Sequence, residues 1–179
     1  MKDNDLEQRV REAVRGLLAD GKVDHIIAFE AGSLKFTTTP LITGDKDGAS
    51  RLVINSFIAN NLSVFLTEVK GRVGIVAKGC DSRSIVSLIQ DNKVSRDDLV
   101  IIGIHCPGLI DIAKVEGLAG KERDEIDGIA REGESVIVTV DGEKKEFPAA
   151  GVLFDDCLSC ETTIPREYDV LIGEPYHKV

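Results

Sequence analysis

Runs of apolar residues alternate along the chain with segments in which apolar residues recur at helical spacing. Leu6, Val10 and Val14 recur in this way and predict an amphipathic helix over Asp5–Asp20. At the centre, residues 72–77 and 98–105 are continuously apolar runs of strand length. Residues 82–90 between them have helical spacing. Strand, helix and strand in this order predict a βαβ unit whose two strands are parallel and covered on both faces.

The second half of the chain carries a different pattern. The charged segment 121–131 predicts an exposed helix. Residues 135–140 then alternate between apolar and polar and continue through an Asp-Gly pair into 144–147, which predicts a β-hairpin with a favoured two-residue turn. Residues 169–173 predict a last short strand, whereas the β-rich stretch 34–39 is expected to end at the proline that follows it.

These elements predict an α/β fold, with a mostly parallel sheet, flanking helices and a β-hairpin insertion. The chain has 179 residues, with no internal repeat and no low-complexity linker, so we expect a single α/β domain over 1–179. Within it, the hairpin insertion is expected at about 134–148, and the C-terminal segment with the C-x-x-C pair at 155–175.

Charge and composition narrow the possible partners. The formal net charge of -9 argues against binding to a nucleic-acid backbone, which requires clustered Lys and Arg. No apolar run approaches the roughly 20 residues that cross a bilayer, so we expect no membrane insertion. The N-terminus is acidic and no hydrophobic signal core follows it, which predicts a cytoplasmic protein.

Four cysteines are the main chemical signal. Cys80 directly follows the first strand of the βαβ unit, and Cys106 follows the second. Because parallel strands end at the same edge of a sheet, we expect these two thiols to lie together at the edge where open α/β sheets bind ligands. Cys157 and Cys160 form a C-x-x-C pair, a spacing at which two thiolates hold one metal centre. If the pair folds over the same edge, all four cysteines converge.

Several interpretations of the cysteines remain open. Four thiolates match an iron–sulfur cluster, and they also match a structural zinc ion, although zinc sites of this type usually contain two C-x-x-C pairs. Cys80 and Cys106 could instead be small buried residues of the core. A redox-active dithiol formed by Cys157 and Cys160 is disfavoured, because three neighbouring carboxylates oppose formation of a thiolate.

Further polar residues are candidates for cofactor binding. Lys78 and Arg83 bracket Cys80, where they could offset the charge of a tetrathiolate cluster or hold a flavin phosphate. The alternative is an ordinary surface pair on a strand–helix loop. Asn60 and Asn61 could bond to a flavin ring, but helix capping is the more common role of Asn.

The residues around the cysteines resemble a known family. Residues 74–83 (GIVAKGCDSR) and 101–108 (IIGIHCPG) are similar to the beta subunit family of coenzyme F-420 hydrogenases and dehydrogenases. The C-terminal segment from Cys157 to Glu174 and the segment from Asn55 to Leu62 are also similar to it, and the resemblance covers roughly residues 5 to 175.

The resemblance implies an iron–sulfur protein, commonly also a flavoprotein, which passes electrons between a flavin or deazaflavin and a partner. By position in the family, one 4Fe–4S cluster would be ligated by Cys80, Cys106, Cys157 and Cys160. Many relatives carry additional ferredoxin-type cysteine motifs, whereas this chain has none. It is therefore expected to relay electrons to other redox subunits, of the hydrogenase, formate dehydrogenase or heterodisulfide reductase type.

Three functional hypotheses follow. The first is an electron-transfer protein or subunit of an oxidoreductase complex, with one 4Fe–4S cluster; FAD is left open, because the chain has no G-x-G-x-x-G fingerprint. The second is a flavin-dependent oxidoreductase that acts on deazaflavin F-420 or NAD(P)H. The third is a zinc-stabilised interaction subunit without redox activity.

Overall fold

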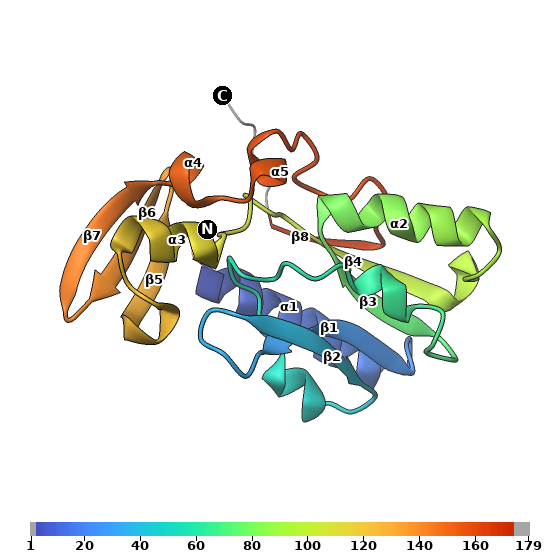
Figure 1. Cartoon of the computed structure of the whole chain (residues 1–179). Helices are drawn as coiled ribbons and strands as arrows, with labels where there is room; N and C mark the ends of the chain where they lie inside the picture. Colours follow the sequence, from blue (N-terminus) through green and yellow to red (C-terminus); the bar gives the residue numbers. More distant parts are fainter. Residues whose placement is uncertain (1–2, 174–179) are drawn as a thin grey trace.

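The computed structural model describes residues 3–173 and contains two β-sheets (Figure 1). The larger sheet has the strand order β2-β1-β3-β4-β8. Strands β1, β3, β4 and β8 are parallel, and β2 is antiparallel to β1. The bounds of the strands are β1 His25–Ala31, β2 Thr38–Thr43, β3 Val73–Ala77, β4 Leu99–Ile104 and β8 Val170–Ile172. The mostly parallel sheet predicted from the sequence is confirmed.

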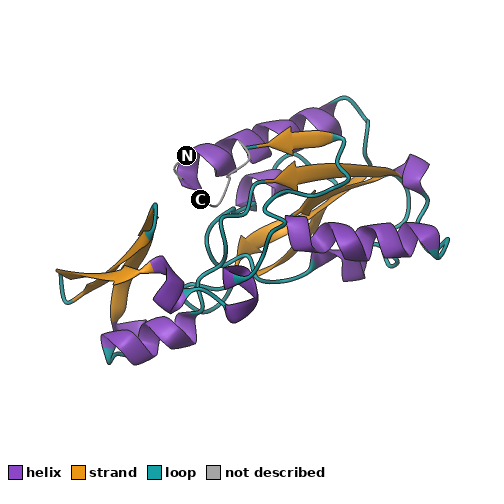
Figure 2. Cartoon of the chain, turned by 90° about the horizontal axis from the view of Figure 1, so that it is seen from above, coloured by secondary structure: helices purple, strands orange, loops and turns teal. Residues whose placement is uncertain are grey.

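Helices cover both faces of the larger sheet. Figure 2 shows α1 (Asp3–Ala19) on one side of the strands and α2 (Gly79–Gln90) on the other. The predicted apolar face of α1 is buried, since Val10 and Val14 have no exposed surface. All five residues of β3 are also buried. The continuously apolar composition of the central strands therefore reflects burial on both faces of the sheet.

A smaller antiparallel sheet lies to one side of the larger one (Figure 1) and has the order β5-β6-β7. The bounds of its strands are β5 Ile126–Glu132, β6 Ser135–Val140 and β7 Glu143–Pro148. Alternate residues of β6 pack against α3 (Ile112–Ala119) and α4 (Ala149–Val152) in a second apolar core. The predicted hairpin thus forms two strands of a three-stranded sheet.

The prediction of an exposed helix over 121–131 is wrong. Only Arg123–Glu125 forms a helical turn (η4), and β5 follows it directly. Strand β5 pairs with β6 along most of its length, and Ile126 is fully buried in the second core. Pairing with a neighbouring strand overrides the helix propensity of the charged residues in this segment.

Two other local predictions are also corrected. Pro40 lies inside β2, where it is paired with Phe29, rather than ending the extended segment. This position is tolerated because β2 is an edge strand and needs no N–H on its outer side. Helix α2 begins at Gly79, three residues earlier than predicted, so Cys80 lies in its first turn. Among residues 3–173, no helix is both long and apolar enough to cross a bilayer.

Candidate metal centre

All four cysteines line one open cavity of about 720 Å³ at the carboxyl ends of β3 and β4. Cys80 comes from the first turn of α2, and Cys106 lies two residues after β4. Cys157 belongs to the single-turn helix α5 (Asp155–Leu158), and Cys160 follows it. None of the four forms a disulfide. The structure thus brings together the two strand-end cysteines and the later pair.

The segment after Cys160 is fixed over the sheet edge by backbone contacts. The N–H of Cys106 donates to the carbonyl oxygen of Thr163 over 2.8 Å. The N–H of Arg166 donates to Ser82 Oγ, in the first turn of α2, over 3.4 Å. Figure 1 shows this segment beside the N-terminal end of α2. These contacts place the later cysteine pair against the strand ends.

A second set of backbone contacts positions Cys157. The N–H of Phe154 donates to the carbonyl oxygen of Leu109 over 3.1 Å, directly before α5 begins. The N–H of Leu109 in turn donates to Cys157 Sγ over 3.4 Å. This contact fixes the position of the Cys157 sulfur relative to the loop after β4.

Arg131, in β5, connects the smaller sheet to the loop after Cys106. Its Nη1 donates to the carbonyl oxygens of Pro107 and Gly108, over 3.0 and 3.1 Å. Gly108 has a φ of +107°, in the region that favours glycine. No sequence pattern indicated this role, because Arg131 lies in a segment predicted as an exposed helix and contacts the site only through the tertiary fold.

Burial controls the protonation state of the Cys106 and Cys80 thiols. Burial raises the pKa of Cys106 to about 12, although a backbone N–H from Gly108 and the charge of Lys78 act in the opposite direction. Although Cys80 is accessible at the surface, the pKa of its thiol is also raised, first by partial desolvation and then by the neighbouring charge of Asp81. Without a metal these two thiols are therefore protonated at neutral pH, and binding of a metal would displace their protons.

Lys78 is buried rather than part of a surface pair. Its Nζ lies 2.9 Å from Asp81 Oδ2, donates to the carbonyl oxygen of Asn60 over 2.9 Å and lies 4.7 Å from the centre of the Phe29 ring. The surface-pair interpretation is therefore wrong for Lys78. Arg83 is exposed and lines the same cavity, which leaves it better placed to face an anion there.

The two asparagines lie outside the residues that line this cavity. Asn61 caps the short helix η2 (Leu62–Phe65), where its side chain accepts from the N–H of Ser63 over 3.1 Å. The Nδ2 of Asn60 donates to the carbonyl oxygen of Thr38 over 3.2 Å. The capping interpretation is confirmed for Asn61.

The four cysteines line one cavity, but they do not meet at a single point. Within residues 3–173, no three His, Cys, Asp or Glu side chains converge closely enough to hold a single metal ion. A tetrahedral zinc site requires four sulfur atoms at about 2.3 Å from one ion. A cluster of several metal ions, by contrast, needs thiolates spread around a larger volume.

A second cavity, of about 530 Å³, lies between the β1–β2 loop and β5. Phe36 and Phe57 line it with their ring centres 5.4 Å apart, and Phe36 has a φ of +57°. Lys35 and Arg131 add positive charge. Because Arg131 also holds the loop after Cys106, this cavity adjoins the cysteine site, and its aromatic and basic lining could hold a flat, anionic cofactor.

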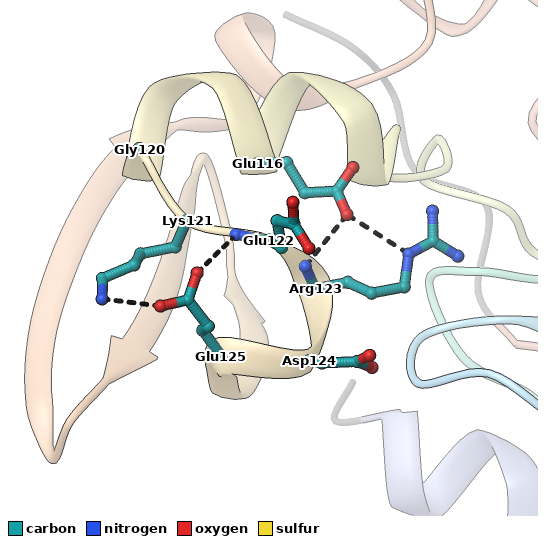
Figure 3. Close-up of a pocket in the computed structure, with 7 residues that line it drawn as sticks. All are labelled: Glu116, Gly120, Lys121, Glu122, Arg123, Asp124 and Glu125. Atoms are coloured by element: carbon teal, nitrogen blue, oxygen red, sulfur yellow. Dashed lines mark hydrogen bonds and ion pairs between the residues drawn. The ribbon is translucent and has the colours of Figure 1, made fainter.

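A third hollow lies in the turn between α3 and β5 (Figure 3). Both of its basic side chains are paired with carboxylates that line it. Lys121 Nζ lies 2.9 Å from Glu125 Oε1, and Arg123 Nε lies 3.2 Å from Glu116 Oε1. These pairs hold the turn between the helix and the strand together, and we assign no ligand to it.

Comparison with known proteins agrees with the resemblance predicted from the sequence. The chain is 25% identical over 173 residues to the F420-dependent formate dehydrogenase 1 subunit beta of Methanococcus maripaludis, covering 88% of this chain and 44% of that protein. The chain thus spans less than half the length of this curated relative. No protein-family model matches the sequence.

A solved structure gives the same result for the fold. The chain superimposes with a TM-score of 0.67 and 15% identity on a chain of the F420-reducing [NiFe] hydrogenase complex from Methanosarcina barkeri, covering 88% of this chain and 62% of that one. At this identity the match shows a shared fold. Both comparisons point to proteins of F420-dependent redox complexes, and the resemblance to this family is therefore confirmed.

Proposed function

We propose that the chain is an electron-transfer subunit of a redox complex and that it holds one 4Fe–4S cluster. The observation that carries this proposal is the shared cavity, lined by Cys80, Cys106, Cys157 and Cys160. Cys80, Cys106 and the Cys157–Cys160 pair are far apart in the sequence, and only the tertiary fold brings them to one edge of the sheet. Four cysteine ligands are what a 4Fe–4S cluster requires.

The arrangement favours a cluster over zinc. A donor set of four thiolates suits either, but the described cysteines surround a cavity of about 720 Å³ instead of meeting at one point. A bound cluster of this kind takes up and releases single electrons. The zinc-stabilised subunit is therefore the weaker alternative.

The protein contributes ligand orientation and hydrogen bonds. The N–H of Leu109 donates to the sulfur of Cys157 over 3.4 Å, and Leu109 belongs to the loop that Arg131 holds. Cys80 lines the cavity and is exposed, so the redox centre would lie close to the surface. This location suits an electron relay, because the partner must approach the cluster closely.

The comparisons indicate the kind of partner. The relatives are a subunit of an F420-dependent formate dehydrogenase and a chain of an F420-reducing hydrogenase complex. We infer that this chain exchanges electrons with other redox subunits, of the formate dehydrogenase, hydrogenase or heterodisulfide reductase type. Co-purification of the native protein under anaerobic conditions would identify them.

Anaerobic reconstitution tests the cluster directly. With iron and sulfide supplied, the chain should bind about four of each and become brown. Reduction by dithionite should bleach the visible absorption. Binding of one zinc ion per chain, with no acid-labile sulfide retained, would instead favour the zinc-stabilised subunit.

A flavin-dependent oxidoreductase is the second candidate, and the second cavity is the observation that favours it. Its volume of about 530 Å³, the Phe36–Phe57 pair and the adjacent basic residues suit FAD or a deazaflavin. Titration with FAD, followed by quenching of flavin fluorescence, tests it. FAD binding by the wild type, with weaker binding in Phe57→Ala, would support the enzyme hypothesis. If FAD does not bind, the electron-relay hypothesis remains and the enzyme hypothesis is dropped.

A further inference from the structure

A buried ion pair lies at the wall of the cysteine cavity. The side chains of Lys78 and Asp81 are 1% and 2% exposed, and Lys78 Nζ lies 2.9 Å from Asp81 Oδ2. Lys78 lines the cavity together with the four cysteines. Burying two charges costs free energy, and apolar side chains of similar volume would often fill such a place at lower cost. Fold stability alone therefore gives a weak explanation for this pair.

The second oxygen of Asp81 faces a ligand candidate. Cys80 Sγ donates to Asp81 Oδ1 across 3.8 Å. A sulfur that binds iron has lost its proton, so it can no longer donate this bond. With a cluster bound, the carboxylate would face a negatively charged sulfur. Lys78 then supplies the only positive charge within hydrogen-bonding distance of that carboxylate among the described side chains.

We propose that the buried Lys78–Asp81 pair sets the reduction potential of the cluster held by the four cysteines. This inference rests on the proposed function. Reduction adds one negative charge to the cluster, so a nearby ammonium favours the reduced state and a nearby carboxylate favours the oxidised state. Because the pair is shielded from water, neither charge is strongly screened.

Two single substitutions should shift the potential in opposite directions. Asp81→Asn removes the negative charge and should raise the potential, whereas Lys78→Met removes the positive charge and should lower it. We expect about a tenfold change in the ratio of reduced to oxidised cluster at a fixed potential, which equals about 59 mV for one electron. The potential of the double variant should lie between those of the two single variants.

The substitutions are chosen to keep the local structure. Asn at position 81 retains an oxygen that can accept the Lys78 backbone N–H, which donates to Asp81 Oδ2 over 2.9 Å at the start of α2. Met at position 78 has a length close to that of Lys and can pack over the Phe29 ring. Circular dichroism of the cluster-free variants, and their iron and sulfide content after reconstitution, verify that fold and loading are preserved.

Asp156→Asn is the matched control. Asp156 lines the same cavity, but its side chain is exposed, so water and salt screen its charge. Its removal should change the potential far less than Asp81→Asn does. A shift in Asp156→Asn as large as that in Asp81→Asn would show that the buried pair has no special role.

The remaining outcomes are distinct. Potentials equal to that of the wild type, or shifts in the same direction in both single variants, would overturn the role of the pair if loading is normal. If Lys78→Met fails to load, Asp81→Asn decides alone: a raised potential supports the role of the pair, and a wild-type potential overturns it. A wild-type chain that retains no iron and sulfide would refute the proposed function itself, before any potential is measured.

Discussion

The backbone N–H of Cys106 donates a hydrogen bond of 2.8 Å to the carbonyl oxygen of Thr163. This bond joins the end of β4 to the segment that follows the later cysteine pair. Without such contacts, Cys157 and Cys160 would have no fixed position relative to the strand ends. The geometry of the cavity therefore depends on backbone contacts between distant parts of the chain.

Gly79→Ala should disrupt this contact region. A Cβ at Gly79 would collide with the carbonyl oxygen of Thr162 and lie 2.9 Å from that of Ile164. Because backbone must move to relieve the overlap, we expect the free energy of unfolding of the cluster-free chain to fall by about 1–3 kcal/mol. Urea unfolding followed by circular dichroism measures it.

Gly117→Ala is the control for this substitution. Gly117 lies inside α3, and nothing is within 4 Å of the position of its Cβ. Alanine favours helix over glycine by up to about 1 kcal/mol, so this variant should be slightly more stable than the wild type. Equal stability of Gly79→Ala and the wild type would show that the close approach at Gly79 is absent.

Arg131→Met should loosen the loop that follows Cys106. The variant loses the hydrogen bonds to the carbonyl oxygens of Pro107 and Gly108. Hydrogen bonds to charged groups contribute about 1.5–3 kcal/mol each, so a reconstituted cluster should be lost to an iron chelator several times faster. Arg15→Met, on the exposed surface of α1, should lose its cluster at the wild-type rate; equal rates in the two variants would contradict the role of Arg131.

Asp169→Ala should detach the start of β8 from its neighbour. Asp169 Oδ2 accepts from the N–H of Ile101 over 2.7 Å, and Oδ1 accepts from Arg96 over 2.6 Å. We expect a loss of about 1–3 kcal/mol, equivalent to a decrease in Tm of a few degrees for a chain of this size. Differential scanning calorimetry measures the decrease. An unchanged Tm would mean that β8 is held without this carboxylate.

The pKa of Cys106 predicts an unusual pH profile for alkylation of the cluster-free chain. Burial raises this pKa from 9.0 to about 12, and iodoacetamide reacts with the thiolate. In a folded variant with Ser at the other three cysteine positions, the rate of alkylation by iodoacetamide should still rise with pH above about pH 10. In urea the rate should level off near the ordinary thiol pKa. A plateau at the same pH in both states would contradict the burial of this thiol.

The same shift links pH to stability. Because the pKa of Cys106 is higher in the folded chain than in the unfolded one, the unfolded chain loses this proton first as pH rises. The contribution of the neutral thiol to stability is therefore complete below about pH 9 and declines as the pH rises toward 12. Replacement of Cys106 by Ala should remove this part of the pH dependence.

The sequence allowed prediction of the elements whose pattern is set by burial. Strands β3 and β4 were predictable because both faces are covered and their residues are continuously apolar. Their parallel course then placed Cys80 and Cys106 at one edge. The sequence did not show whether the C-x-x-C pair at 157–160 lies at this edge. Backbone hydrogen bonds between distant segments, such as the one from Cys106 to Thr163, leave no local pattern in the sequence.

Other features depended on tertiary contacts that a linear pattern does not encode. Strand β5 contains several charged residues, which led to the prediction of an exposed helix. Its extended conformation depends on pairing with β6. The sequence left Lys78 either as a cofactor contact or as a surface residue, yet Asp81, Asn60 and Phe29 surround its ammonium group. The spacing of Lys78 and Asp81 at the start of a helix was the one available signal for their contact.

The content of acid-labile sulfide decides whether the four cysteines hold a cluster. It should be measured after anaerobic reconstitution of the wild type and of the Cys157→Ser/Cys160→Ser variant. Our account predicts about four sulfides per wild-type chain and close to none in the variant, since two of the four ligands are removed. A variant that keeps the wild-type sulfide content would show that the later cysteine pair does not hold the cluster.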